Sequence, residues 1–180
     1  MGYAGVHSDQ VNYTFIAADC GDQPRTEGEH YPGAGDSQRS AFEGAFRDLR
    51  RCEWSITAGY HTTYNCIAWS VDETNSWYNS SYIAHNYGDK DDVFEIEDMD
   101  DFYLKKKGWT KITLGTDEQK AAQAEAMYYS AYHGARKKGC GCGANKWIMY
   151  ESKCGGWERI EHVWDHLNGL CYGSPIRFYK

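Results

Sequence analysis

The stretch YNCIAWS, residues Tyr64 to Ser70, decides which structural element we predict in the middle of this chain. It places an Asn and then a thiol directly before an apolar run. Asn and Thr side chains begin helices because they accept a backbone N–H of the first turn, so Asn65 or Thr63 is near a cap position. We therefore predict a short buried helix with Cys66 in its first turn, where the helix dipole and unpaired amides favour a thiolate.

Three interpretations of Cys66 are open from these residues alone: a packed core thiol, a metal ligand and a nucleophile. A Cys in an apolar run is most often an inert core residue. A nucleophilic thiol requires an imidazole that shares its proton and later protonates a leaving amine. His133 is the candidate base, because it follows the apolar run AMYYSAY and could project from a strand toward a packed helix.

A third residue would orient that imidazole, and the later run IMYESK offers two candidates, Glu151 and Ser152. Neighbouring residues of a strand point to opposite faces. Only one of the two can therefore take this role.

Length and composition indicate one domain, residues 1–180, with a loop-rich arm over residues 1–36 and a core over residues 37–180. The chain has 180 residues, of which 41% are hydrophobic, and this is enough for a single core. Seven Trp and 15 Tyr exceed the needs of such a core. Some of these rings are therefore expected to line a binding cleft.

Charge and hydropathy exclude several classes of partner. The formal net charge is −7, with acidic residues gathered between Asp89 and Asp101, so nucleic acid is not expected as a partner. No run approaches the roughly 20 apolar residues of a membrane helix, so no membrane span is expected. The first 21 residues lack a secretion signal, which predicts a cytoplasmic protein at synthesis and export, where it occurs, by a signal-peptide-independent system.

Sequence patterns predict an α+β domain. A helix is expected behind the Ser40–Glu43 capping box, and a second over residues 94–109, where acids come first and lysines precede Gly108. The segments AMYYSAYHGARK and KWIMYES predict two antiparallel strands around the turn GCGCGAN. A strand is also expected over residues 172–180 and in VNYTFIA, and a late helix near Trp157 to Leu167.

Several segments together resemble a family of small bacterial domains: NCIAWSV, YHGARK, WIMYESKCG and RIEHVWDHLNGLCYGSPIRFYK. Members of that family carry N-C-x-A-W, H-A-A or H-G-A, S-K-x-G and I-x-H…L-x-G…Y-G. The family is similar to the NlpC-type papain-like cysteine hydrolases, which cleave amide bonds, often in the peptide part of peptidoglycan. The resemblance covers residues 65–180.

The resemblance implies a papain-like fold in which the helix bearing the Cys packs on an antiparallel sheet. It implies Cys66 as nucleophile, His133 as base and Ser152 in the third position, with Glu151 beside it. NlpC-type members have His, Asn or Gln in that third position, so the sequence departs from the family there. Some signal-less antibacterial effectors use this chemistry, and an immunity protein is then an expected partner.

Substrate contacts are expected from Asn65, Trp69, Trp77 and Tyr78. The last two lie in NSWYNSSYIAHNYG, whose aromatic and polar composition suits a cleft wall. Surface aromatics held by loop packing are an equal alternative for this segment.

No cofactor and no metal ion are expected. A zinc site would require four thiols such as Cys140, Cys142, Cys154 and Cys171. The first two have the spacing C-x-C, whereas zinc sites usually have C-x₂₋₄-C. Two other interpretations are open: the thiols are incidental to a glycine-rich turn, or they have a redox role.

Three functions follow from the sequence. The first is a cysteine amidase or peptidase that acts on a peptidoglycan peptide or a protein, as an antibacterial toxin would. The second keeps the same Cys–His pair in an acyl transferase or a glutamine deamidase. The third is a non-catalytic binding module in which Cys66 is buried and inert.

Overall fold

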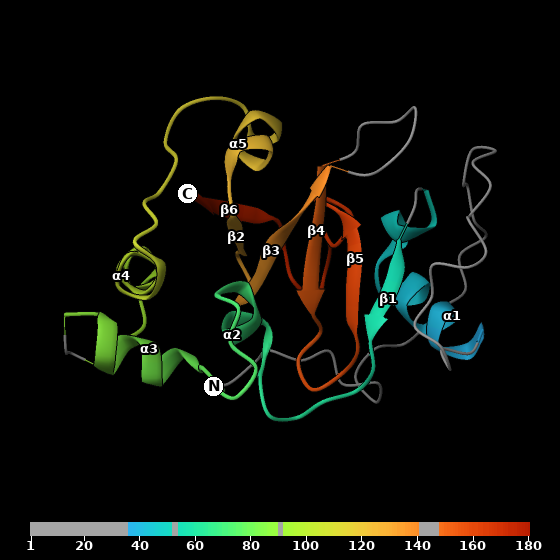
Figure 1. The fold of residues 1–180 in the computed structure, drawn as a ribbon, viewed down its shortest axis with the longest axis horizontal. Coiled ribbons are helices and arrows are strands. Elements are labelled where there is room, and N and C mark those ends of the chain that lie inside the picture. The colour runs from blue at the N-terminus through green and yellow to red at the C-terminus, as the bar shows by residue number, and fades with distance from the viewer. Residues whose placement is uncertain (1–35, 52–53, 90–91, 141–147) are drawn as a thin grey trace.

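The computed structural model describes residues 36–51, 54–89, 92–140 and 148–180, and shows an α+β fold built on a six-stranded antiparallel sheet (Figure 1). The order of the strands in the sheet is β1-β5-β4-β3-β2-β6. Their bounds are Ser55–Ala58 (β1), Ala126–Tyr129 (β2), His133–Cys140 (β3), Ile148–Lys153 (β4), Arg159–Val163 (β5) and Pro175–Tyr179 (β6).

In the described part of the chain, six helical segments surround this sheet, with α1 beyond β1 and α3 and α4 on the opposite side in Figure 1. They are α1 (Asp36–Ala45), the 3-10 helix η1 (Arg47–Arg51), α2 (Cys66–Ser70), α3 (Ser80–Tyr87), α4 (Ile96–Lys107) and α5 (Asp117–Gln123). The expected helix behind Ser40 is only partly correct. It begins earlier, at Asp36, and ends at Ala45, and η1 continues the chain as a tighter helix.

Helix α4 confirms the prediction for residues 94–109. Glu95 and Asp98 form a capping box, and the last turn carries Lys105, Lys106 and Lys107. Gly108 follows with φ +72°, a left-handed conformation that glycine adopts without steric cost.

The C-terminal third is more strand-rich than the sequence predicted. AMYYSAYHGARK folds into two strands, β2 and β3, joined by a turn in which Tyr132 has φ +56°. The late helix near Trp157 to Leu167 is wrong, because β5 occupies Arg159–Val163. Ile160 and His162 are buried there and alternate with the less buried Arg159 and Glu161, which is the period of a strand. The strand over residues 172–180 is confirmed as β6.

Apolar side chains pack on both faces of the sheet. We call the two groups the α1-side cluster and the α2-side cluster. The α1-side cluster includes Phe42, Phe46, Leu49, Trp54, Ile56, Met127, Tyr129, Ala135, Tyr150, Cys154, Ile160, Tyr172 and Phe178. The α2-side cluster includes Tyr64, Cys66, Ile67, Trp69, Tyr78, Ile83, Met99, Phe102, Tyr103, Ala126, Tyr128, Tyr132 and Tyr179.

The central strands supply both clusters in turn. Along β2, Ala126 and Tyr128 belong to the α2-side cluster, whereas Met127 and Tyr129 belong to the α1-side cluster. Strand alternation therefore decides which face each side chain of the site occupies.

Two expectations concern parts of the chain beyond this description. The N-terminal arm was expected over residues 1–36, of which residues 1–35, including the strand VNYTFIA, lie outside the described residues, and Asp36 begins α1. Within the described ranges, no helix has the length and apolar character needed to cross a membrane.

Candidate functional site

Cys66 is the first residue of α2, as the sequence predicted. The side chain of Asn65 caps this helix by accepting the backbone N–H of Ala68 at 3.1 Å. The Cys66 thiol lies against the start of β3 and donates to the carbonyl oxygen of Tyr132, with 3.8 Å between Sγ and oxygen. The thiol is thus held beside the backbone that leads into His133.

Burial controls the ionisation of this thiol. The Cys66 side chain has no exposed surface, and burial raises the pKa of Cys66 to about 11. Backbone N–H groups of Gly134 and Ile67 and the charge of Lys153 act in the opposite direction and lower the pKa. In this closed state the thiol is therefore protonated at neutral pH.

The ring of His133 lies on the other side of β3. A Cβ at Gly134 would meet the side chain of Ser70 on α2, so Gly134 faces α2 and the neighbouring His133 faces away. There the imidazole stacks on Tyr172 with 3.6 Å between ring centroids and contacts the edge of Tyr129.

The expected hydrogen bond between Cys66 and His133 is therefore not formed. Neither ring nitrogen of His133 has a hydrogen-bond partner among the described residues. Burial, together with the neighbouring His162, holds the pKa of His133 well below its usual range, so the ring is neutral. Its two nitrogens are polar groups left unpaired in the interior, and this is unusual in a native structure.

The two candidates for the orienting residue are engaged elsewhere. The hydroxyl of Ser152 bonds Nε2 of His162 at 2.8 Å, and Nδ1 of His162 donates to the carbonyl of Val163 at 2.7 Å. Glu151 is on the opposite face, where its carboxylate pairs with Arg159 at 3.2 Å and with Lys138 at 3.6 Å. Neither residue orients His133 in this structure.

Trp69 is buried and packs against two guanidinium groups, so it is not an open substrate surface. The guanidinium carbon of Arg159 is 4.0 Å from the Trp69 ring centroid, and that of Arg136 is 4.9 Å away. Arg136 also pairs with Asp72, just after α2. These cation–π contacts attach α2 to β3 and β5.

Asn65 and Tyr78 form one structural unit. The amide of Asn65 donates to the Tyr78 carbonyl at 2.5 Å, and the buried Tyr78 hydroxyl donates to Glu73 at 2.5 Å and accepts from Lys106 at 2.6 Å. These contacts hold the loop after α2 in place. Of the four residues expected to contact substrate, Asn65, Trp69 and Tyr78 are buried, and Trp77 is exposed over 45% of its surface.

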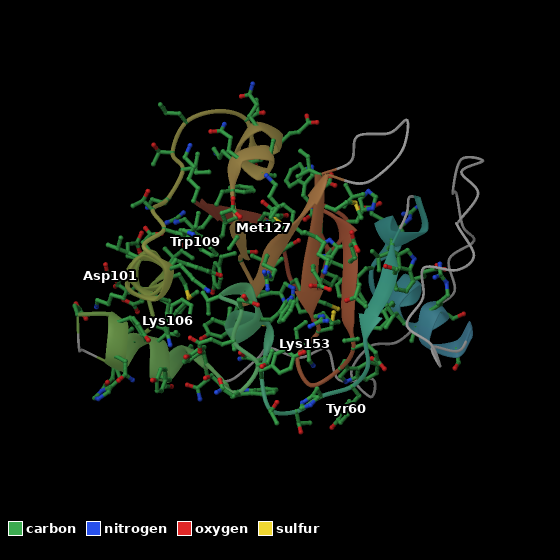
Figure 2. The ribbon with its side chains drawn as sticks, in the orientation of Figure 1. Tyr60, Asp101, Lys106, Trp109, Met127 and Lys153 are labelled. Carbon is green, nitrogen blue, oxygen red and sulfur yellow. The ribbon has the colours of Figure 1, made fainter. Side chains whose placement is uncertain are left out.

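Lys153 is a residue of the site that sequence reasoning left without a role. It ends β4 beside α2 (Figure 2), and its side chain is completely buried. Its ammonium group donates to the carbonyls of Gly155, at 2.7 Å, and Trp157. The sequence signal was a lysine at the end of an otherwise buried strand, since lysine is rarely buried without a specific reason.

The four thiols that a zinc site would require lie only partly within the described residues. Cys142 and the side chain of Cys140 lie outside the described residues, whereas Cys154 and Cys171 are free thiols. Within the described part of the chain, no group of three or more His, Cys, Asp or Glu side chains could hold a metal ion.

Comparison with known proteins gives one match. A family model described as a domain of unknown function (DUF7689) matches residues 55–180, which include every strand of the sheet and the whole of the site. No curated protein and no solved structure matches the chain.

Proposed function

Since this chain belongs to the DUF7689 family, whose function is unknown, we propose its function from its own site: a cysteine-dependent amide-bond hydrolase with Cys66 as nucleophile. One observation carries the proposal. The Cys66 thiol begins a capped helix and lies 3.8 Å from the Tyr132 carbonyl, against the strand that bears His133. A papain-like arrangement of a Cys helix on an antiparallel sheet is part of the same proposal.

The proposed reaction is acyl transfer in two steps. The Cys66 thiolate attacks the carbonyl carbon of an amide, and the leaving amine departs with a proton as the thioester forms. Water then attacks the thioester, which releases the carboxylic acid product and regenerates the Cys66 thiol. Backbone N–H groups near Cys66 support this role, because they can hold the oxyanion that develops in each step.

Access to the sulfur requires movement, because Cys66 has no exposed surface. The role of His133 as base stays a prediction. Its unpaired ring nitrogens are consistent with that role, and its position away from α2 requires the turn between β2 and β3 to rearrange.

Peptidoglycan peptides are the first substrate to test, and a protein substrate is the second. We expect purified protein to release new amino groups from peptidoglycan, as measured by mass spectrometry of the soluble products. The variant Cys66→Ala should be inactive while its melting temperature stays close to that of the wild type. Full activity of Cys66→Ala would exclude this mechanism.

Two further variants complete the experiment. Cys171→Ala removes a half-buried thiol at the margin of the α1-side cluster and should retain activity. His133→Gln should be inactive if the imidazole is the base. Treated protein lysate distinguishes the related chemistries, because transfer replaces the ammonia of a glutamine side chain with another amine, whereas deamidation hydrolyses the side chain to glutamate and releases ammonia.

The proposed biological setting follows from the substrate. A peptidoglycan-cleaving protein would act as an antibacterial toxin that an immunity protein neutralises in the producing cell. Toxicity in the periplasm of a test bacterium, absent in Cys66→Ala, is the expected result.

A non-catalytic binding module is the second candidate, and the burial of Cys66 is the observation that favours it. A thiol whose pKa is raised to about 11 by burial reacts slowly. Labelling with iodoacetamide near pH 6 separates the two candidates, since a catalytic thiol alkylates in the native protein and an inert one reacts only after denaturation.

A further inference from the structure

Lys153 is the one lysine with a fully buried side chain in the part of the chain that the structure describes. Its ammonium group bonds two backbone carbonyls, which carry no net charge. A buried ammonium is costly unless a negative group lies near it or its charge has a use. Cys154, Cys66 and Glu158 are the neighbours whose negative charge favours this ammonium, and Cys66 is the one that begins α2.

The sheet register places Lys153 on the same face as α2. Lys153 pairs with Arg159 across β4 and β5, and Arg159 stacks on Trp69 of α2. Ala135 pairs with Ser152, so the next position along the register brings Gly134 opposite Lys153. The backbone N–H of Gly134 is one of the groups that lower the pKa of Cys66.

A second contact fixes the end of the side chain. The Lys153 ammonium lies 5.3 Å from the ring centroid of Tyr64, two residues before Cys66. The ammonium is therefore held between the turn after β4, which supplies the two carbonyls, and the residues that lead into α2. The ring of His133, in contrast, lies on the other face of β3 against Tyr172.

From this geometry we propose that Lys153 is a positioning residue that supplies the positive charge favouring the Cys66 thiolate. The inference rests on the proposed function, because only a reactive sulfur uses such a charge. On ionisation the thiol proton passes to buffer base, and the ammonium of Lys153 remains protonated throughout. No covalent bond to Lys153 forms.

Other titratable groups surround this pair. Burial lowers the pKa of Lys153 to about 8, whereas negative charge on its neighbours raises it. The groups that interact electrostatically with the lysine are Cys154, Glu158 and Arg159, and those that interact with the thiol are Tyr103, Tyr128, Tyr132 and, from the other face of the sheet, Tyr172. The ammonium is thus present at neutral pH and is lost as the pH rises through about 8.

The experiment measures the rate at which iodoacetamide alkylates Cys66 in the full chain, followed by peptide mass spectrometry. In this reaction an S–C bond forms and iodide leaves. Lys153→Gln keeps an N–H that can donate to the two carbonyls but removes the charge, and Lys153→Arg keeps the charge. Cys171 in the same samples is the internal control.

Lys153→Gln should slow the alkylation of Cys66 near neutral pH by about tenfold, which corresponds to a shift of one pKa unit. Lys153→Arg should stay within about twofold of the wild type, and the Cys171 rate should not change. Equal rates in Lys153→Gln and the wild type would overturn the inference, as would equal losses in both variants, which indicate a purely structural lysine.

The wild-type protein gives a test that requires no variant to fold. The rate for an ordinary thiol below its pKa rises tenfold per pH unit. If the ammonium favours the thiolate, its loss makes the rate rise less steeply above about pH 8. An unchanged slope overturns the inference alone, whereas a Cys66 that never reacts in the native protein overturns the proposed function as well.

Discussion

Replacement of Gly134 by alanine tests how closely α2 packs on β3, the contact that positions Cys66. A Cβ at Gly134 would lie 2.9 Å from Oγ and 3.0 Å from Cβ of Ser70, and 3.2 Å from the hydroxyl oxygen of Tyr103. Ser70 is held in place, since its hydroxyl donates to the carbonyl of Ile67 at 2.7 Å and lies 2.7 Å from the Tyr103 hydroxyl. The added methyl group therefore has no room.

The expected cost follows from these distances. Ordinary contacts begin at 3.4 Å, so α2 would have to move by about 0.5 Å, the difference between 3.4 and 2.9 Å, in a well-packed region. Overpacking of this kind costs about 1–3 kcal/mol. For a chain of this size we expect Gly134→Ala to lower the melting temperature by about 4–8 °C, which corresponds to about 2 kcal/mol.

Urea and thermal unfolding followed by circular dichroism measure this effect. Gly156→Ala is the matched control, because its added Cβ would meet Thr62 and Tyr60 at 3.8 and 3.9 Å, and we expect a change within about 0.5 kcal/mol. Ser70→Gly removes two of the three close contacts, so it should recover about 1 kcal/mol in combination with Gly134→Ala. If Gly134→Ala is as stable as the wild type, α2 does not pack on β3 as described.

Three further predictions concern the hydrogen bonds of the site. Asn65→Ala removes the cap of α2 and the bond to Tyr78, and should lower the free energy of unfolding by about 1–2 kcal/mol in urea. Ser152→Ala leaves a nitrogen of His162 unpaired, and should cost about 1–3 kcal/mol without changing the alkylation rate of Cys66. Burial lowers the folded-state pKa of His162 to about 3, so acid protonates the unfolded chain first. Below about pH 6.5, His162 should therefore contribute a slope of about 1.4 kcal/mol of lost stability per pH unit, to which the buried His133 adds. His162→Gln should reduce that slope, and an unchanged urea midpoint between about pH 7 and 5 would contradict the assignment.

The sequence predicted the elements whose signals are local. Helix α4 has acids at its start, lysines at its end and a glycine stop, and each of these acts within a single turn. The start of α2 was predicted for the same reason, because the cap by Asn65 depends on residues three positions apart. Two missed helices carried similar signals. Asn79 caps α3 by accepting the N–H of Tyr82, and Thr116 forms a capping box with Gln119 in α5.

The error in β5 has a different cause. A helix was expected near Trp157 to Leu167, where the structure has the strand Arg159–Val163. His162 can be buried because Ser152 on the neighbouring strand β4 forms a hydrogen bond with its ring. This bond is a contact between strands and not between residues of one helix. Buried residues alternate along residues 159–163, but five residues are too few to separate a strand from a helix by period alone.

In the site, too, features that depend on neighbouring residues were predictable, and features that depend on strand pairing were not. The place of Cys66 at a helix start was predictable, whereas the direction of the His133 ring depends on the pairing of β3 with its neighbours. One shift of register would move that ring to the other face. The position of Lys153 likewise depends on the pairing of β4 with β3 and β5.

The two clusters on opposite faces of the sheet have a consequence for the exchange of backbone hydrogens with solvent. Strand β2 lies between β3 and β6, and all four of its side chains are buried, two in each cluster. Deuterium from the solvent can reach these amides only when the sheet separates, so they should be among the slowest to exchange, at the rate of global unfolding. In β1, at the edge of the sheet, local fraying should allow exchange much earlier.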